Sequence, residues 1–276
     1  MTLTQAGVLG IVQGITEFLP ISSIAHLRVI PALFGWPDPG AAYSAVIQLG
    51  TLAAVLAYFA GDVRDMTQGV LAGAVRGQPW ASQEARLGWF VVVGTIPIAV
   101  CGIAFKRYIV GEWRSLYVIA GSLIVLGLLL WLAERAASFR REITQVGWLD
   151  SQLIGLAQAV ALIPGSSRSG TTMTAAMFLG LTREAAARFS FLLGIPAIGA
   201  AGVFELKDLL KHGLGDGGLS ALVVGTMTSA VSGYLAIDLL LRYLRRNSMY
   251  VFVWYRIALG VLLLALLGLG VLTPLG

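Results

Sequence analysis

Charged side chains are scarce in this sequence, and apolar runs take their place. Of the 276 residues, 12% are Asp, Glu, Lys or Arg and 57% are hydrophobic. A soluble domain has about a quarter charged residues and about half apolar ones. The composition therefore excludes an ordinary soluble domain and predicts a polytopic membrane protein. The net charge of +5 comes from basic residues that flank apolar segments, which favours roles in topology and lipid contact over binding of nucleic acid.

Cysteine and histidine are also nearly absent. The single cysteine, Cys101, excludes an internal disulfide, and the two histidines form no zinc-binding cluster with it. Basic residues are missing from the first segment as well, because the first one is Arg28. A cleavable signal peptide begins with a charged region, so we expect the first apolar segment to remain in the mature protein.

The apolar segments fall into two length classes. A helix needs about 20 apolar residues to cross a bilayer core. Six segments meet this length: residues 41–60, 87–105, 115–133, 185–206, 219–241 and 251–272. Four are too short: residues 5–19, 22–34, 152–163 and 170–181. We expect each adjacent short pair to enter the membrane, turn, and leave by the same side, the alternative being one kinked spanning helix per pair.

The turns of these short pairs repeat one pattern. Residues 10–26 and 155–170 each contain an apolar helix that breaks at a proline and then at a Ser-Ser pair. Residues 92–95 and 223–226 share Val-Val-Gly-Thr, which also indicates a duplication. One short pair and three spans per half make an odd number of crossings, so the second half should run upside down. The sequence thus predicts an all-α membrane domain over residues 1–276, with repeats of about 1–140 and 145–276.

The distribution of Lys and Arg predicts the orientation. With both termini outside, eleven basic residues fall in the inner segments and five in the outer loops. By the positive-inside rule, this bias favours termini on the outer side of the membrane.

The first break carries acid–base chemistry. Gln13 and Glu17 stand four residues apart on one face of the short helix before the turn. An ionised glutamate is costly in an apolar setting and requires a cation, a proton or a network of donors. Ser22 and Ser23 begin the next helix, and His26 follows Ser23 on the same face. Glu17 and His26 can therefore act as acid, base or metal ligand.

The second break carries an anion-binding pattern. The residues concerned are Ser166, Ser167, Arg168, Ser169, Gly170 and Thr172. A guanidinium, several hydroxyls and two helix N-termini together favour phosphate. A serine at a helix start, taken alone, is usually just an N-cap, and a lone Glu or His in a membrane helix is more often a hydrogen-bonding partner between helices than a catalyst. Arg168 has no acid close in sequence, so its partner must come from elsewhere in the fold.

Two further polar residues lie in apolar segments. Gln48 either lines the site or bridges two helices. Arg256 stands near the start of the last apolar segment, within a turn or two of the interface, and we expect its side chain to extend to the membrane surface.

These motifs resemble those of the bacterial undecaprenyl-pyrophosphate phosphatases, the family linked to bacitracin resistance. The likeness covers the whole chain and includes residues 46–50 and 189–193. The resemblance implies a hydrolase that converts undecaprenyl pyrophosphate to undecaprenyl phosphate and inorganic phosphate, and so recycles the carrier lipid of cell-wall synthesis. It also implies a multi-pass protein of the bacterial inner membrane, an active site that opens to the periplasm, and a requirement for Mg²⁺ or Ca²⁺. Bacitracin is expected to compete for the substrate, while monomer and homodimer both remain open.

The resemblance also assigns roles to particular residues. Gln13 and Glu17 match the family's Glu-or-Gln, three residues, Glu pattern and are the expected metal ligands. The candidate catalytic residues of the family correspond to Ser23, His26, Ser167 and Arg168. Two positions depart from the family pattern: Ile24 stands where Thr is usual, and Gln13 supplies a neutral amide in place of a second carboxylate.

The expected mechanism begins with the diphosphate held by Arg168, Ser167 and the two helix N-termini. Ser23 then attacks the terminal phosphorus, while His26 or Glu17 takes its proton. Arg168 and the cation stabilise the charge of the transition state. Attack by water or by His26 requires the same residue types and stays open. The alternative function is an anion or lipid-phosphate transporter, or a flippase, built on the same inverted repeat.

Overall fold

The computed structural model describes residues 1–212 and 218–274, and every regular secondary-structure element within them is an α-helix or a short 3-10 helix. The helices of the first half are α1 (Leu3–Phe18), α2 (Ser23–Phe34), α3 (Gly40–Tyr58), α4 (Ala60–Val75), α5 (Gln83–Ala104), α6 (Lys106–Val110) and α7 (Leu116–Ala136). Those of the second half are α8 (Trp148–Val160), α9 (Arg168–Phe178), α10 (Arg183–His212), α11 (Gly218–Leu244) and α12 (Tyr250–Gly268). Short 3-10 turns cover Glu112–Arg114 and Ile143–Gln145.

The predicted spans are present as helices. In the described part of the chain, α5, α7, α10, α11 and α12 are long and apolar enough to cross a membrane, and α3 and α4 pass the same test only when the bent pair is counted as one span. The prediction of an all-α polytopic membrane protein is therefore confirmed.

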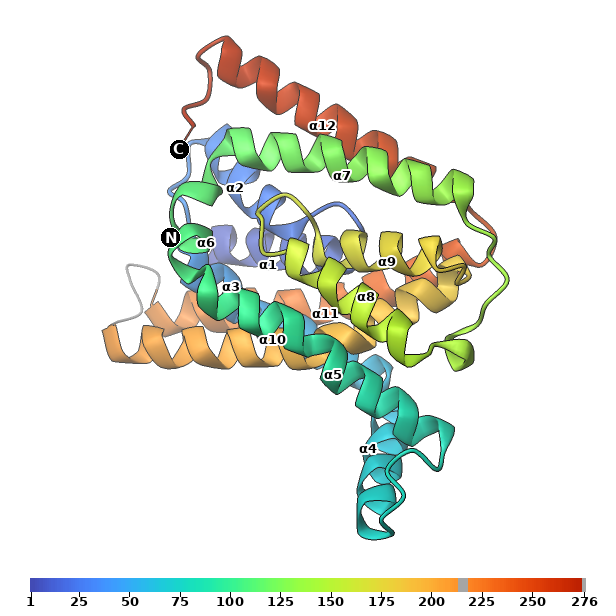
Figure 1. Ribbon diagram of the computed structural model, residues 1–276. Helices are drawn as coiled ribbons and strands as arrows, with labels where there is room; N and C mark the ends of the chain where they lie inside the picture. Colours follow the sequence, from blue (N-terminus) through green and yellow to red (C-terminus); the bar gives the residue numbers. More distant parts are fainter. Residues whose placement is uncertain (213–217, 275–276) are drawn as a thin grey trace.

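Helix α4 was not predicted from the sequence. The chain bends by 79° between α3 and α4, and α4 projects from the bundle together with the start of α5 (Figure 1). Asp62, Arg64 and Asp65 interrupt the apolar pattern here, so the segment reads as a loop when only apolar length is considered. A Cβ at Gly69 would lie 2.8 Å from the backbone nitrogen of Ala85, which shows how closely α4 and α5 pack.

The second short pair is re-entrant. Arg141, in the loop before α8, donates to both carboxylate oxygens of Asp150 at 3.0 and 2.5 Å. The same guanidinium donates to the carbonyl oxygen of Leu179 at 2.8 Å. Because Asp150 lies in the first turn of α8 and Leu179 just follows α9, the pair begins and ends on the same side. The alternative of a single kinked span is excluded for this pair.

The first short pair enters from the opposite end. Helix α1 begins and α2 ends near the N-terminus, whereas α8 begins and α9 ends at the far end of the bundle (Figure 1). Met1 and Trp36, which precede α1 and follow α2, pack against the same apolar cluster. The two turns therefore point toward each other inside the bundle.

Packing between the halves is reciprocal. Helix α1 packs along α11, and α8 packs along α5. A Cβ at Gly10 on α1 would lie 2.3 Å from the carbonyl oxygen of Gly225, and a Cβ at Gly155 on α8 would lie 2.3 Å from that of Gly94. These four glycines occupy matching places in the repeated motifs. Each short helix thus packs on a span of the other half, as an inverted repeat predicts; the exact repeat boundaries stay a prediction.

Candidate active site

Each break ends in a serine with unusual backbone geometry. Ser22 and Ser167 cap α2 and α9 with φ angles of 75° and 67°. A non-glycine residue in such a conformation costs roughly 1–3 kcal/mol and is concentrated at functional sites. Each hydroxyl accepts a hydrogen bond from the amide three residues on, Ala25 at 3.4 Å and Gly170 at 3.1 Å. The structure therefore confirms that these two serines are N-caps. The helix ends that they cap face the site.

The helix ends that these two serines cap carry free backbone amides. The backbone N–H groups of Ser23 and Ile24 on α2, and of Arg168 and Ser169 on α9, have no hydrogen-bond partner among the residues that the structure describes. Free N–H groups at a helix start carry partial positive charge, which attracts phosphate oxygens.

The two breaks contact each other directly. The hydroxyl of Ser169 donates to the carbonyl oxygen of Leu19 at 3.0 Å, so α9 begins against the end of the first short helix. Buried Arg256 joins them a second time, because it donates to Pro20 O at 3.0 Å and to Ser166 O at 2.9 Å.

Arg256 holds the breaks against α7 as well. Its guanidinium donates to the carbonyl oxygens of Leu123 at 3.4 Å and of Gly165 at 3.2 Å. The residue is 0% exposed, so the expectation that its side chain reaches the membrane surface is wrong. The side chain turns toward backbone carbonyls that the two breaks leave without helical partners, and these acceptors satisfy its donors.

Glu17 is the centre of the polar site. Its carboxylate accepts hydrogen bonds from Gln13 Nε2 at 2.8 Å, from Ser23 Oγ at 2.8 Å and from Arg168 Nη2 at 2.9 Å. Only 6% of Glu17 is exposed. The pair of Glu17 and Arg168 joins the two halves, and it supplies the distant acid that the sequence required for Arg168.

This geometry separates two chemical roles. Because the Ser23 hydroxyl donates to Glu17, the carboxylate is placed to take the proton when the oxygen attacks an electrophile. Arg168 brings positive charge to the same carboxylate from the other half and also donates to Ser190 O at 3.2 Å. The Oε1 atom of Gln13 is buried and has no partner in the described part of the chain.

His26 lies in a separate hydrogen-bonded pair. Its Nδ1 is 2.7 Å from Ser22 O and its Nε2 is 2.6 Å from the Tyr255 hydroxyl, with the two rings stacked at an interplanar angle of 9°. A carbonyl can only accept, so Nδ1 carries a proton, and in the neutral imidazole Nε2 then accepts from the tyrosine. The Ser23 hydroxyl donates to Glu17, so the structure favours Glu17 over His26 as its proton acceptor.

The remaining predicted residues surround this centre. Ser166 has a buried hydroxyl without a partner among the described residues. Thr172 lies 2.6 Å from the Ser190 hydroxyl and donates to Arg168 O at 2.7 Å, which ties α9 to α10. Gln48 is half-buried on α3. Their roles in phosphate binding or site lining stay predictions.

Three site residues were missed from the sequence. Tyr255 and Ser190 contact His26 and Arg168, and Gly194 lies under the guanidinium, because a Cβ there would be 2.0 Å from Arg168 Nη1. Ser190 lies within residues 189–193, which share the family likeness, and Gly194 follows them directly, but the sequence assigned neither residue a role. Nothing in the sequence distinguished Tyr255 from other aromatic residues in apolar helices.

Two broken helices of this membrane bundle bring together a carboxylate, a hydroxyl, a guanidinium and free helix N-termini. Such a site defines a class of membrane proteins equipped to bind phosphate anions and to act on them. The chain belongs to the bacitracin resistance protein BacA family, which it matches over residues 6–262.

Curated relatives match the chain over nearly its full length. An undecaprenyl-diphosphatase from Myxococcus xanthus is 57% identical over 275 residues, which covers 100% of this chain and 92% of the relative. One from Chloroherpeton thalassium is 53% identical over 278 residues and covers 98% of each chain. A third, from Chlorobium limicola, is 50% identical over 282 residues, covering 99% of both.

Proposed function

We propose that this protein is a membrane phosphatase that hydrolyses undecaprenyl pyrophosphate to undecaprenyl phosphate and inorganic phosphate. The observation that carries the proposal is the constellation of Glu17, Ser23 and Arg168, which forms only where the two breaks meet. A pure anion-binding pocket has no need of a serine hydroxyl that donates to a buried carboxylate. The family and the names of its curated members point to the same reaction.

In the first step, Ser23 Oγ attacks the terminal phosphorus of the diphosphate. The bond from that phosphorus to the bridging oxygen breaks, undecaprenyl phosphate leaves, and the proton of Ser23 passes to Glu17 at 2.8 Å. Water then attacks the phosphoserine and passes one proton to a phosphate oxygen, while the bond from phosphorus to Ser23 Oγ breaks and Glu17 returns its proton to that oxygen. Inorganic phosphate leaves, with Ser23 and Glu17 restored. Direct attack by water, assisted by the same carboxylate, is the competing mechanism.

Charge stabilisation comes mainly from the second half. Phosphoryl transfer leaves little covalent work to the protein, so catalysis depends on positioning and on positive charge near the phosphate oxygens. Arg168 and the free amides at the starts of α2 and α9 supply both. Ser166, with its unpartnered buried hydroxyl, is a further donor available to the diphosphate.

Gln13 and Glu17 offer oxygen atoms that would suit a divalent cation, Mg²⁺ or Ca²⁺. The unpartnered Oε1 of Gln13 lies on the side chain that donates to Glu17, which gives two kinds of oxygen ligand. The described residues contain no group of three His, Cys, Asp or Glu that could hold a metal. Mg²⁺ commonly binds one or two carboxylates together with substrate phosphates, so Gln13 and Glu17 would hold it with the diphosphate. When bound, the cation would neutralise phosphate charge.

We further propose that the protein lies in the bacterial inner membrane with this site open to the periplasm. The basic-residue bias supports this orientation, because it puts the N-terminus, and hence the open end of the α1–α2 pair, on the outer side. Bacitracin would then compete for the lipid diphosphate on that side, and the antibiotic resistance of the family would follow from removal of its target.

The test is phosphate release from purified protein in detergent, with undecaprenyl pyrophosphate and Mg²⁺ or Ca²⁺. No gradient exists in detergent, so a transporter or flippase would release no phosphate. We expect Ser23→Ala to abolish release while substrate binding persists, and a quenched single turnover with labelled terminal phosphate to leave label on the unmodified protein. Unchanged turnover in Ser23→Ala would remove the serine mechanism, and no release by the unmodified protein would refute the phosphatase.

A further inference from the structure

The first turn of α2 is held by a side chain as well as by the backbone. In a capped helix the carbonyl oxygen of the N-cap residue accepts the first hydrogen bond within the helix. The amide of His26 lies 3.4 Å from Ser22 O, a long contact, whereas the ring nitrogen Nδ1 of His26 lies 2.7 Å from the same oxygen. An N–H···O bond is usually about 2.9 Å long, so the imidazole supplies the stronger bond to this carbonyl.

The second half builds the same turn without such help. Ser167 occupies the place of Ser22, and its carbonyl oxygen accepts from the amide of Thr171 at 2.9 Å. Thr171 is four residues after its cap, as His26 is, but its hydroxyl donates to Arg168 O and not to the cap carbonyl. The first break therefore depends on an imidazole where the second has an ordinary helical bond.

The carbonyl of Ser22 shares a peptide group with the amide of Ser23. The described peptide bonds are trans, and a trans peptide is planar, so its C=O and N–H bonds point in opposite directions. A bond that fixes the direction of Ser22 O also fixes the direction of the Ser23 N–H, one of the free amides at the start of α2. The imidazole thus orients a donor at the point where the proposed mechanism places phosphate.

Tyr255 on α12 holds the other side of the imidazole. Its hydroxyl lies 2.6 Å from His26 Nε2, and the planes of the two rings differ by 9°. Because Nδ1 donates to a carbonyl, the neutral ring has an unprotonated Nε2 that accepts from this hydroxyl. The next residue, Arg256, donates to Pro20 O at 3.0 Å. Helix α12 therefore holds the first break at two carbonyls, through His26 at Ser22 and directly at Pro20.

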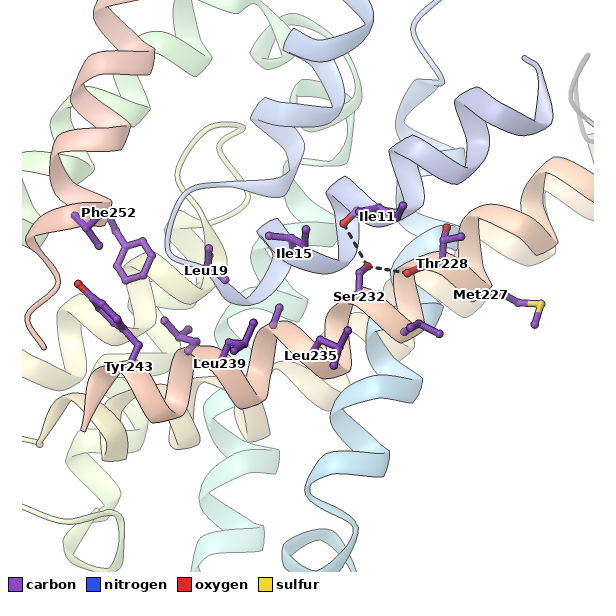
Figure 2. Close-up of a pocket in the computed structure, with 14 residues that line it drawn as sticks. Ile11, Ile15, Leu19, Met227, Thr228, Ser232, Leu235, Leu239, Tyr243 and Phe252 are labelled. Carbon is purple, nitrogen blue, oxygen red and sulfur yellow. Dashed lines mark hydrogen bonds between the residues drawn. The ribbon is translucent and has the colours of Figure 1, made fainter. Parts of the chain in front are cut away.

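The imidazole also borders an apolar space. A cavity of about 330 Å³ reaches His26 and Tyr255, and it is not lined by Glu17 or Ser23. Figure 2 shows the larger apolar groove that this cavity adjoins, with Phe252 of α12 lining both. This setting suits a ring that positions the backbone better than one that exchanges protons with a diphosphate.

We propose that Tyr255 and His26 form a relay of hydrogen bonds that orients the peptide group before Ser23, so that its amide points toward the phosphate. His26 is then a positioning residue that acts through the backbone, and Tyr255 is a positioning residue that acts through His26. The relay needs a donor at Nδ1 and an acceptor at Nε2 but no transfer of a proton. The inference rests on the proposed phosphatase function and replaces the acid–base role that the sequence suggested for His26.

The experiment compares two neutral amides in place of the imidazole. The amide nitrogen of asparagine stands as far along the side chain as Nδ1, so His26→Asn keeps a donor for Ser22 O. The amide nitrogen of glutamine corresponds to Nε2, so His26→Gln loses that donor and reaches toward Tyr255. Neither amide takes up a proton at neutral pH, and His26→Ala removes both positions. Phosphate release gives kcat/KM, and thermal unfolding in detergent shows whether each variant is folded.

We expect His26→Asn to keep kcat/KM within about threefold of the unmodified protein, and His26→Gln and His26→Ala to lose at least about tenfold, because only asparagine fixes the peptide. Equal losses in all three variants would overturn the proposal and make the imidazole a proton carrier. Retention by glutamine but not by asparagine would also overturn it, because the contact at Nε2 would then carry the effect.

Tyr255→Phe tests whether the tyrosine acts through His26. We expect kcat/KM to fall about fivefold in the otherwise unmodified protein, as for the loss of one hydrogen bond between neutral groups, and less than about twofold in the His26→Asn background, whose side chain is too short to reach the hydroxyl. The control is Tyr117→Phe, which should have no effect: Tyr117 is 50% exposed and precedes Ile119 on α7 as Tyr255 precedes Ile257 on α12. Equal losses from Tyr255→Phe in both backgrounds would overturn the relay.

The tautomer of His26 gives a measurement that does not depend on turnover. The sequence contains two histidines, so the His26→Asn spectrum, which keeps only His212, assigns the imidazole signals in nitrogen NMR of isotope-labelled protein. We expect neutral His26 to carry its proton on Nδ1, with Nε2 unprotonated. A proton on Nε2 with Nδ1 unprotonated would overturn the proposal, whatever the variants do. An unmodified protein that releases no phosphate would refute the phosphatase and leave the tautomer as it is, so the two failures are distinct.

Discussion

Gly194→Ala should remove most activity without unfolding the protein. A Cβ at this position on α10 would lie 2.0 Å from Arg168 Nη1 and 2.6 Å from its Cζ. An ordinary contact is about 3.5 Å, so the guanidinium must move by roughly 1.5 Å. The bond from Arg168 Nη2 to Glu17 is 2.9 Å, and a shift of that size breaks it.

The expected magnitude follows from that displacement. A misplacement of about 1 Å in an active site can cost a factor of about 10² in rate. We therefore expect kcat/KM to fall about 100-fold, equivalent to ~2.7 kcal/mol of lost transition-state stabilisation. Folding should be nearly unaffected, because the clash involves the far end of a flexible side chain and alanine favours a helix by about 1 kcal/mol over glycine.

The control is the same substitution five residues further along the same helix. A Cβ at Gly199 would have Leu52 Cδ2 as its nearest neighbour at 3.6 Å, an ordinary contact, so Gly199→Ala should keep full activity. Phosphate release and thermal unfolding in detergent are measured for both variants. A folded Gly194→Ala protein with more than about a third of the original kcat/KM, a change under ~0.7 kcal/mol, would refute the steric argument.

Three other predictions follow from the site and the topology. Arg168→Lys should lose most turnover at saturating lipid and metal although it keeps the charge, because an ammonium cannot reproduce the planar fork of donors; a rate within about threefold of the original would make Arg168 a peripheral cation. Glu17→Gln should not be rescued by raised Mg²⁺ if Glu17 accepts the proton of Ser23, whereas substantial rescue would identify it mainly as a metal ligand. A reporter fused after the last residue should be periplasmic, and a cytoplasmic result would contradict the basic-residue bias.

Most of the fold could be predicted from the lengths of the apolar segments and from the repeated motifs. The lengths of the apolar segments distinguished the membrane spans from the short helix pairs, because the thickness of the bilayer core sets a minimum length for a spanning helix, whatever its packing. Helix α4 was missed because charged residues end the apolar run at Asp62, and hydropathy gives no signal for a helix that is bent by 79° from α3. The meeting of the two breaks was predictable from the odd number of crossings per half.

The identities of the polar residues were predictable, but several of their partners were not. Glu17 and Arg168 could be named as costly charges that need partners, yet their pairing joins residues 151 positions apart and depends on the packing of both halves. Arg256 was misjudged for the same reason. Its partners are backbone carbonyls. Every residue has one, so no side chain in the sequence identifies these partners, and the distance of Arg256 from the membrane surface did not predict where its side chain lies.

The two halves have divided one reaction between them. Counting from the cap serines, Ser22 and Ser167, the residue that follows is Ser23 in the first half and Arg168 in the second. The residue five positions before each cap is Glu17 in one half and Leu162 in the other. In the proposed mechanism, the first half thus holds the nucleophile and its base, and the second supplies the guanidinium, while each contributes a helix N-terminus. The hydroxyl that donates to a carboxylate lies in the first half, and the guanidinium beside that carboxylate comes from the second. The proposed chemistry therefore requires the contact between the breaks that Arg256 and Ser169 hold in place.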